Sequence, residues 1–408
     1  MGPGANICSQ VFHVKRLSAR NGARCYHDPV NRSRALLLGL ILLSLPVFAA
    51  CVNVTSPDGW AAPVFDGDDV YIASSKGHLS ALTIDEQGRA AARWTFPDKD
   101  RDADKKIEPE ALYGDPVVEG ERVYLATFSA GVFALNTADG RPAWPTSGTN
   151  SGAIDGNIAS GVALANGILY FGTTEGQLYA WNASDGSPAW PAPITFGRGI
   201  WATPVVLGER VYVATMGGEV HARSAVDGSP AWDAPFVATG AIGSLTALGE
   251  DRLFVPSINR HAYILDAGSG AVIADYRAKD WVWTAPAGSD SRMYFGDFGG
   301  HVYGLDITSQ GATQAWDPAS VDGERIKAGA AVVDDVLVVA DRKPVVTFIK
   351  ASTGEVLNRV PIDGAGTIRA NVTVEGDSVY IVTTKGRLFR ANPKNYSVVE
   401  IEVSGVKK

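Results

Sequence analysis

Six aromatic or basic side chains occupy one repeated position in this 408-residue sequence. The position lies ten residues before an apolar pair that recurs along the chain, as Trp201 does before Val211-Tyr212. Aromatic faces bury apolar groups and cations pair with anions, so this set of side chains favours recognition of a ligand or peptide. The six residues are Trp60, Tyr113, Trp201, Trp283, Lys327 and Arg369. Ala159 and Gly243 hold the same position in the two remaining copies.

Chemistry that requires cysteine is excluded from most of the chain. The cysteines are Cys8, Cys25 and Cys51, and none follows them. The chain beyond Cys51 therefore forms no internal disulfide, no thiolate metal site and no cysteine nucleophile.

An internal repeat provides the framework for the six residues. Successive apolar pairs are 40 to 53 residues apart, with most spacings in the low forties. Each pair lies among short alternating segments separated by turn residues, which predict four strands; around Trp201 these are 204–206, 211–214, 220–224 and 230–236. A period of this length is typical of a propeller blade, so we predict an all-β, eight-bladed β-propeller with four antiparallel strands per blade. The pairs begin at Val70, Val123, Leu169, Val211, Leu253, Met293, Leu337 and Val379.

The predicted ring gives the six residues a common place. Each would begin the innermost strand of its blade, so that together they surround one mouth of the central channel. We predict that this mouth binds a ligand or partner through its aromatic surfaces and its two positive charges. The alternative is that the aromatic side chains plug the channel and that the cations are solvated.

A second repeated motif identifies a family. An Asp-Gly turn precedes a tryptophan in the segments 137–144, 183–190 and 225–232, which read TADGRPAW, ASDGSPAW and AVDGSPAW. This motif resembles the tryptophan-docking repeat of pyrroloquinoline-quinone (PQQ) propellers, and the resemblance covers residues 60–403. It implies that each tryptophan packs between neighbouring blades, as core rather than site. In size, blade number and cysteine usage the chain is similar to the propeller lipoproteins of the outer-membrane β-barrel assembly machinery.

The same resemblance also includes enzymes. Quinoprotein dehydrogenases of this fold bind PQQ near the channel mouth beside calcium, with a disulfide between adjacent cysteines and an acidic base. This chain has no cysteine pair, and the carboxylates near the innermost strands, Asp115 and Asp155, lack companions. Asp297 lies in a predicted β-turn within 294–300. We therefore predict no catalytic residue, no metal and no resident cofactor, with a PQQ-dependent dehydrogenase as an alternative.

Two further groups of polar residues could bind metal. His78, His261 and His301 each lie eight residues after an apolar pair begins, in different units, so they would point in different directions and could not share one ion. In the segment 97–113, aspartates alternate as in calcium loops, but Ala103 and Pro109 replace the expected Gly and Glu. We predict a solvated loop there, with calcium binding or partner docking as alternatives.

The N-terminal region resembles an export signal. Arg32 and Arg34 precede an apolar run over 35–50, which is short for a membrane span. Phe48-Ala49-Ala50-Cys51 resembles the lipobox of bacterial lipoproteins, which implies lipid on Cys51. We predict a signal region over 1–50, with translation starting near Val30 rather than at Met1. A lipid-anchored linker over 51–59, the propeller over 60–403 and a tail over 404–408 follow.

The net charge of the exported chain and its expected lipid anchor restrict the classes of function that fit the sequence. Residues 51–408 contain 30 Lys/Arg and 43 Asp/Glu, a net charge of −13, which argues against nucleic acid as a partner. We predict a non-catalytic, monomeric scaffold in the cell envelope that binds proteins and acts in membrane-protein assembly. Val52 after the lipidated cysteine implies the outer membrane facing the periplasm, or the outer face of the cytoplasmic membrane in a one-membrane organism. A small-molecule or glycan receptor is a further alternative.

Overall fold

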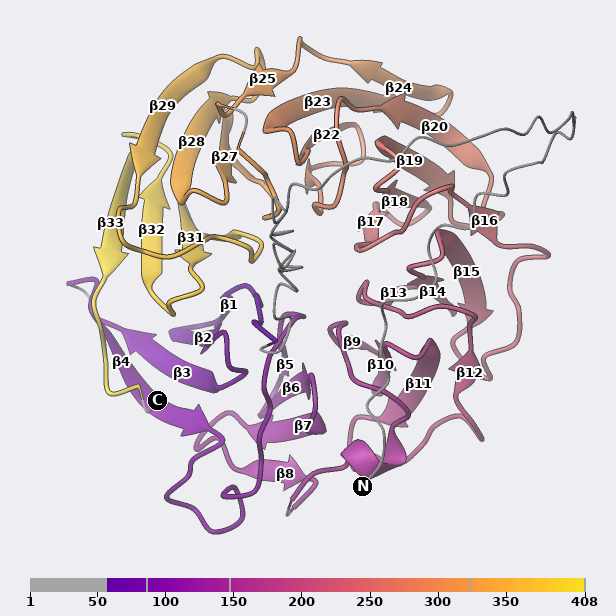
Figure 1. The fold of residues 1–408 in the computed structure, drawn as a ribbon, viewed down its shortest axis with the longest axis vertical. Helices are drawn as coiled ribbons and strands as arrows, with labels where there is room; N and C mark the ends of the chain where they lie inside the picture. The colour runs from indigo at the N-terminus through magenta and orange to yellow at the C-terminus, as the bar shows by residue number, and fades with distance from the viewer. Residues whose placement is uncertain (1–56, 86, 147, 323, 407–408) are drawn as a thin grey trace, which may run out of the picture. The chain divides into compact units, whose positions relative to one another are not determined.

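Eight antiparallel sheets form a ring, as the repeat predicted (Figure 1). The structure is a computed structural model that describes residues 57–85, 87–146, 148–322 and 324–406. The signal region, the linker as far as residue 56, and Cys51 lie outside the described residues. Among the described residues, no helix is long and apolar enough to cross a membrane. The prediction of an all-β, eight-bladed propeller is confirmed.

The first four blades follow one another along the chain. Blade one contains β1 (Val64–Asp66), β2 (Asp69–Ala73), β3 (Leu79–Ile84) and β4 (Ala90–Phe96). Blade two contains β5 (Val117–Glu119), β6 (Arg122–Thr127), β7 (Gly131–Asn136) and β8 (Pro142–Trp144), followed by the short helix η1 (Ser151–Ala153). Blade three contains β9 (Ala163–Ala165), β10 (Ile168–Gly172), β11 (Gln177–Asn182) and β12 (Ile194–Thr195). Blade four contains β13 (Val205–Leu207), β14 (Arg210–Ala214), β15 (Glu219–Ser224) and β16 (Phe236–Val237).

The remaining blades complete the ring. Blade five contains β17 (Thr246–Leu248), β18 (Arg252–Pro256), β19 (His261–Asp266) and β20 (Val272–Arg277). Blade six contains β21 (Ala287–Gly288), β22 (Arg292–Gly296), β23 (His301–Thr308), β24 (Gly311–Gln314) and β25 (Ala319–Ser320). Blade seven contains β26 (Ala331–Val333), β27 (Val336–Ala340), β28 (Val345–Lys350) and β29 (Val356–Pro361). Blade eight contains β30 (Thr373–Glu375), β31 (Ser378–Val382), β32 (Leu388–Asn392) and β33 (Ser397–Ile401), before a final strand β34 (Val403–Ser404).

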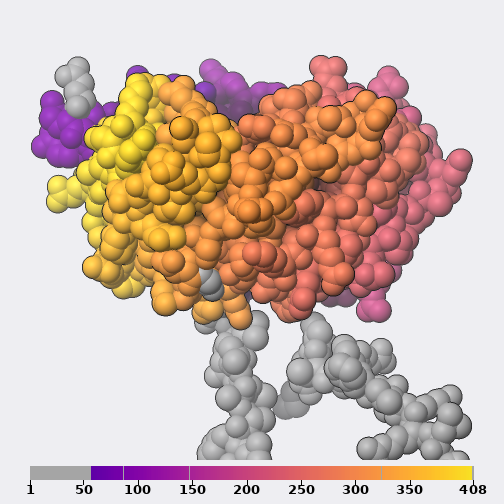
Figure 2. Space-filling model, turned by 90° about the horizontal axis from the view of Figure 1, so that it is seen from above, coloured from indigo at the N-terminus to yellow at the C-terminus, as the bar shows by residue number. Residues whose placement is uncertain are grey.

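Burial of both sheet faces explains why the blades need one another. Successive side chains of a strand point to opposite faces. In β14, Val211 and Val213 pack in a cluster with blade three, whereas Tyr212 and Ala214 pack in a cluster with blade five. Alternate residues of one strand therefore belong to two different interfaces, and the blades pack side by side (Figure 2).

The fourth strand of blade four is shorter than predicted. The alternating pattern predicted a strand over 230–236, but β16 spans Phe236–Val237, and only an isolated bridge joins Pro230 to Arg223. Proline lacks the N–H that a ladder requires, and Trp232 leaves the sheet to pack on the next blade. The prediction was wrong because docking of the tryptophan replaces the ladder there.

Docked tryptophans join successive blades, as the resemblance implied. The indole Nε1 of Trp232 donates a 3.0 Å hydrogen bond to the carbonyl of Ala267 in blade five. A Cβ on Gly270, in the turn of that blade, would come within 2.8 Å of the indole ring. The glycine, with φ of +77°, therefore lets the turn cover the indole. Comparable bonds to the next blade are made by Trp94, Trp144, Trp190 and Trp316.

The segment 97–113 is not the solvated loop that its charge predicted. Asp104 is buried, accepts a hydrogen bond from the Asp98 N–H at 2.9 Å and pairs with Arg101 at 2.6 Å. Ile107 and Leu112 are buried in the cluster of blades one and two. The aspartates therefore include an internal anchor of the loop, which folds onto the core through the buried side chains of Ile107 and Leu112.

The ring closes through the C-terminal strand. β34 pairs in parallel with β4, placing Val403 beside Ala90, and the Ala90 N–H donates to the Glu402 carbonyl at 2.8 Å. Figure 1 shows this last, yellow segment running along the indigo strand of blade one. The closing strand extends to Ser404, one residue into the predicted tail. The four main strands of blade one follow one another along the chain, and so do the four strands of blade eight. Closure of the ring therefore depends on the short strand β34 and on side-chain packing.

Removal of the closing strand is expected to weaken the ring. A chain that ends at Ile401 loses the β4–β34 ladder and the contact of Val403 with the blade-one and blade-eight core. We expect a loss of about 1–3 kcal/mol in the free energy of unfolding, measured by urea titration. A chain that ends at Val406 keeps β34 and is the control. Equal stability of the two truncated chains would show that β34 contributes nothing to closure.

Candidate functional site

The structure brings the six predicted residues to one cavity. Each lies four residues before the first strand of its blade. The prediction that they begin the innermost strands was therefore wrong by four residues. All six line a cavity of about 290 Å³. An equivalent position in a ring has the same height in every blade, which explains why residues so far apart in sequence meet. They are Trp60, Tyr113, Trp201, Trp283, Lys327 and Arg369.

The aromatic and cationic groups contact one another within this cavity. The Trp60 and Tyr113 rings meet edge to face, with centroids 4.4 Å apart. Lys327 Nζ lies 3.3 Å from the centroid of Trp60 and 5.9 Å from that of Trp283. Such contacts are attractive because the face of an aromatic ring carries partial negative charge. Lys327 is therefore held between two indoles.

Burial weakens the charge of this lysine. Removal from water, together with the nearby charge of Arg369, lowers the pKa of Lys327 to about 8. The alternative in which both cations are simply solvated is thus wrong for Lys327, because the ammonium is largely surrounded by protein. A cavity remains beside the aromatic side chains, so they do not fill the channel mouth.

Lys327 is expected to lower stability at neutral pH. Its folded-state pKa is below its unfolded value, so the folded protein holds the proton less tightly and stability rises with pH from about 8 to about 10. Lys327→Met removes this cost, and we expect a gain on the order of 2 kcal/mol at pH 7 that shrinks as the pH rises toward 10. Urea titrations at several pH values measure it. The exposed Lys106→Met is the control, and a gain that did not depend on pH would contradict the explanation.

One carboxylate lines the cavity beside these cations. The Asp115 carboxylate accepts a hydrogen bond from the Ala62 N–H at 2.5 Å, and burial raises the pKa of Asp115. Thr203 and Asn371 hold the corresponding position in other blades and accept from the backbone of the preceding blade at 2.9 and 2.8 Å. Asp115 therefore joins blades one and two. Asp155, the other candidate carboxylate, is exposed and is not among the residues that line the cavity.

A larger cavity adjoins the first. It has a volume of about 390 Å³ and shares Trp201, Trp283, Lys327 and Arg369 with the smaller cavity. Four further aromatic or basic side chains complete it, and sequence reasoning missed them. They are Trp281, Phe298, Arg325 and Arg342.

Periodic signals could have found all four of these residues. Trp281 and Arg325 lie two positions before Trp283 and Lys327. Alternate residues of an extended segment point to the same side, so each pair presents two side chains to the cavity. Phe298 and Arg342 lie in the turns that follow β22 and β27, and each lies five residues after its apolar pair begins, as Ile258 does in blade five.

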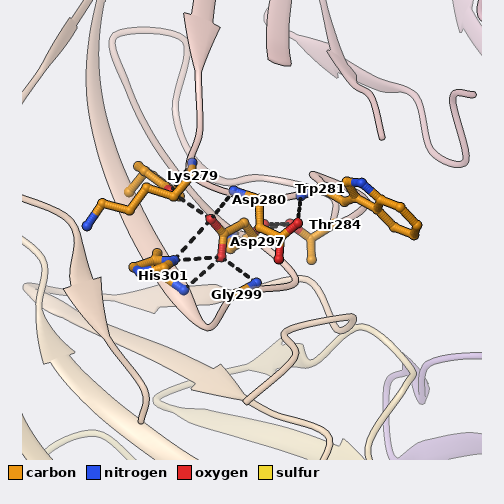
Figure 3. Close-up of polar contacts among 9 residues, drawn as sticks. Lys279, Asp280, Trp281, Thr284, Asp297, Gly299 and His301 are labelled. Atoms are coloured by element: carbon orange, nitrogen blue, oxygen red, sulfur yellow. Dashed lines mark hydrogen bonds and ion pairs between the residues drawn. The ribbon is translucent and has the colours of Figure 1, made fainter. Parts of the chain in front are cut away.

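A buried aspartate holds the segment that carries Trp281 and Phe298. Asp297 is fully buried and accepts hydrogen bonds from the Asp280 N–H at 3.0 Å and the Tyr303 hydroxyl at 2.7 Å (Figure 3). It also accepts the N–H groups of Gly299 and His301, both at 2.9 Å. The prediction placed Asp297 in a turn but missed this role.

Comparison with the other blades explains how Asp297 acquires it. Four residues after an apolar pair begins, most blades carry a small hydroxyl side chain that accepts hydrogen bonds from the turn, as Thr215 does from Glu219 at 3.2 Å. An aspartate at this position has a second oxygen, which here receives Asp280 and Tyr303. Asp280 in turn accepts the Trp281 N–H at 2.8 Å. Asp297 therefore positions one wall of the larger cavity.

Three of the described histidines each contact a carboxylate of their own blade. His261 contacts Asp275 at 2.5 Å, His301 contacts Asp297 at 3.1 Å, and His221 contacts Glu219 at 3.1 Å. Among the described residues, no group of three His, Cys, Asp or Glu side chains could hold an ion. The calcium and PQQ arrangement of the quinoprotein dehydrogenases does not fit these donors, because Asp115 is the one carboxylate among the described cavity-lining residues and already bonds to the backbone.

Comparisons with known proteins place this geometry in context. A family model described as outer membrane protein assembly factor BamB matches residues 55–146, 145–240, 218–324 and 310–399. BamB of Escherichia coli K12 and BamB of Shigella dysenteriae serotype 1 are each 36% identical over 84 residues. Each of these alignments covers 21% of this chain and 21% of the relative.

Solved structures share the fold. BamB from Moraxella catarrhalis is similar with a TM-score of 0.64 and 15% identity, over 81% of this chain and 95% of that one. A quinohemoprotein alcohol dehydrogenase from Pseudomonas putida HK5 is similar with a TM-score of 0.61 and 13% identity, over 81% of this chain and 71% of that one. At these identities the likeness concerns the fold alone.

Proposed function

Because this chain belongs to the family of the outer membrane protein assembly factor BamB, we propose that it is a non-catalytic propeller scaffold that binds proteins during membrane-protein assembly in the cell envelope. The observation that carries the proposal is the family match, which spans residues 55–399 and thus almost the whole ring. A rigid ring with loops at its ends suits presentation of binding surfaces to partners.

The proposed anchor is lipid on Cys51. The sequence Phe48-Ala49-Ala50-Cys51 supports it, and the basic and apolar residues before it support export. A single lipidated residue would hold the propeller at the outer membrane, facing the periplasm. Cys51→Ser is expected to move the protein from the membrane fraction to the soluble fraction, and an unchanged distribution would refute the anchor.

The proposed binding face is the channel mouth. Its six ring residues combine indole faces, one phenol and two cations around one cavity. Indoles and guanidinium groups are the side chains that most often dominate the binding energy of protein interfaces. Asp115 is the one carboxylate that lines the two cavities among the described residues, and it already bonds to the backbone, which supports a binding role rather than PQQ chemistry. A dye-reduction assay with added PQQ and calcium is expected to show no activity.

Chemical crosslinking in native membranes, followed by affinity purification, tests the scaffold function. We expect a stoichiometric partner that belongs to the machinery for assembling outer-membrane proteins, and lower levels of outer-membrane β-barrel proteins when the chain is deleted. Trp201→Ala with Trp283→Ala is expected to reduce recovery of the partner while the fold remains intact by circular dichroism. Recovery without such a partner, together with normal β-barrel levels, would refute the proposal.

A further inference from the structure

We infer that the larger cavity binds an extended segment of a partner protein in which an aromatic side chain is flanked by Asp or Glu. The inference rests on the proposed scaffold function and specifies the chemistry of the ligand. The cavity combines apolar walls with an unbalanced set of positive charges, and the two features together define what complements it.

The walls of the cavity are aromatic and accessible. Trp201 is 37% exposed and Trp281 is 46% exposed, although large aromatic side chains are normally buried in this ring. Phe298 lies beside Trp281, with ring centroids 6.1 Å apart. These rings come from blades four and six and flank the same cavity of about 390 Å³. An aromatic or large apolar side chain would bury their exposed faces and gain hydrophobic free energy.

The charge of the cavity is positive. Arg325, Lys327, Arg342 and Arg369 line it, and no Asp or Glu does so among the described residues. None of the four has an ion pair or a side-chain hydrogen bond with another described residue, and the Lys327 ammonium lies over the rings of Trp60 and Trp283. Three guanidinium groups therefore keep their donors available. Planar guanidinium groups bind carboxylates through paired hydrogen bonds, so acidic side chains are the complementary ligand.

The two carboxylates next in sequence to Arg325 and Trp281 bond to groups other than the four cations, although Asp280 keeps its negative charge. Glu324 precedes Arg325 but pairs with Lys343 at 2.5 Å. Asp280 precedes Trp281 but accepts the Trp281 N–H at 2.8 Å. The positive field is thus a local property of the mouth in a chain whose exported part is strongly acidic overall. This contrast disfavours long polyanions, which the rest of the surface would repel.

The cavity is prepared in advance for binding. Asp297 accepts the N–H of the residue before Trp281 and that of the residue after Phe298, and the Phe298 N–H donates to the Trp281 carbonyl at 2.9 Å. Lys327 is held by Trp60. The backbone that carries Trp281 and Phe298 is therefore ordered before a ligand binds, which lowers the entropy cost of binding at this wall. A neutral glycan would leave four cations without partners, so a short acidic and aromatic peptide fits better.

Fluorescence anisotropy with labelled octapeptides and the full chain, purified in detergent, tests the inference. The probe GSEFDESG combines a phenylalanine with three acids, GSEADESG lacks the ring, and GSQFNQSG lacks the charge. We expect GSEFDESG to bind at least tenfold more tightly than either control, with affinity that falls as salt is added. Similar binding of all three peptides, or no binding of GSEFDESG, would overturn the inference.

Variants assign the binding to this cavity. Trp281→Ala, and Arg325→Gln with Arg342→Gln, are each expected to weaken binding of GSEFDESG about tenfold, whereas the exposed Lys106→Gln leaves it unchanged. Binding that all these variants leave unaltered would place the peptide elsewhere and overturn the inference. Binding of PQQ in place of the peptide would assign the cavity to a small polycarboxylate and also overturn it.

The inference and the scaffold function can fail separately. Loss of peptide selectivity with intact recovery of the membrane partner refutes only the ligand chemistry assigned to the larger cavity. Selective peptide binding without a partner in membranes refutes the role in assembly but leaves the recognition chemistry in place.

Discussion

Trp232→Ala is expected to lower the free energy of unfolding by about 3–5 kcal/mol. The indole is 7% exposed, packs with the cluster of blades four and five, and donates to the Ala267 carbonyl. The substitution removes this bond and leaves a cavity beneath the turn that holds Gly270. Because neighbouring blades share the interface, the loss should appear in one cooperative transition of the whole ring. Urea titration followed by circular dichroism measures it.

Two further variants separate packing from hydrogen bonding at this position. Trp232→Phe keeps most of the buried ring and is expected to lose about half as much free energy, since only the N–H and part of the volume disappear. Trp201→Ala removes an indole from the exposed mouth and should cost about 1 kcal/mol or less. Equal effects of Trp232→Ala and Trp201→Ala would contradict the assignment of Trp232 to the core and Trp201 to the site.

Asp297→Ala is expected to be comparably destabilising, by about 3–5 kcal/mol. The carboxylate accepts three partly buried backbone N–H groups and the buried Tyr303 hydroxyl, and all four would lose this acceptor. Breaking a buried network costs more than the net value of its bonds, since each group left behind has lost its water. The measurement is urea unfolding, combined with hydrogen exchange of the Asp280 and Gly299 amides.

Asp297→Thr provides the matched comparison. Threonine occupies this position in blades two, three and four, where its hydroxyl accepts from the turn. The variant should therefore restore the bonds to Gly299 and His301 but not those to Asp280 and Tyr303, with about half the loss of the alanine variant. We expect it also to weaken binding at the mouth, because Trp281 loses its support. Equal stability of the Asp297→Thr and Asp297→Ala variants would refute the role of Asp297 as a shared hydrogen-bond acceptor.

The architecture could be predicted because its signals are repeated. The apolar pair exemplified by Val211-Tyr212 and the docked tryptophans recur in several blades, and burial between identical neighbours requires that recurrence. Features that occur once were missed. β34 is a pair of residues whose role depends on contact with β4 more than 300 residues away. Burial of Asp104 depends likewise on the packing of Ile107 and Leu112, further along its loop, in the core of blades one and two.

The site was predicted in part for the same reason. The six ring residues share one repeat position, so a common cavity followed once the blades were aligned. Trp281 and Arg325 share the position two residues earlier, which alternation along the chain could have revealed. Phe298 and Arg342 share the position five residues after an apolar pair begins, in the turn after the second strand, which the repeat could also have revealed. The role of the mouth in binding stays a prediction.

Site-specific photocrosslinking in living cells tests the central claim, that the channel mouth is the partner-binding face. A photoreactive phenylalanine would replace Trp281 at the mouth, and in a second strain Val226, which is 76% exposed and follows β15 at the end away from the cavity. The account predicts a crosslink from position 281 to a component of the outer-membrane protein assembly machinery and none from position 226. A partner captured at position 226 but not at position 281 would contradict it.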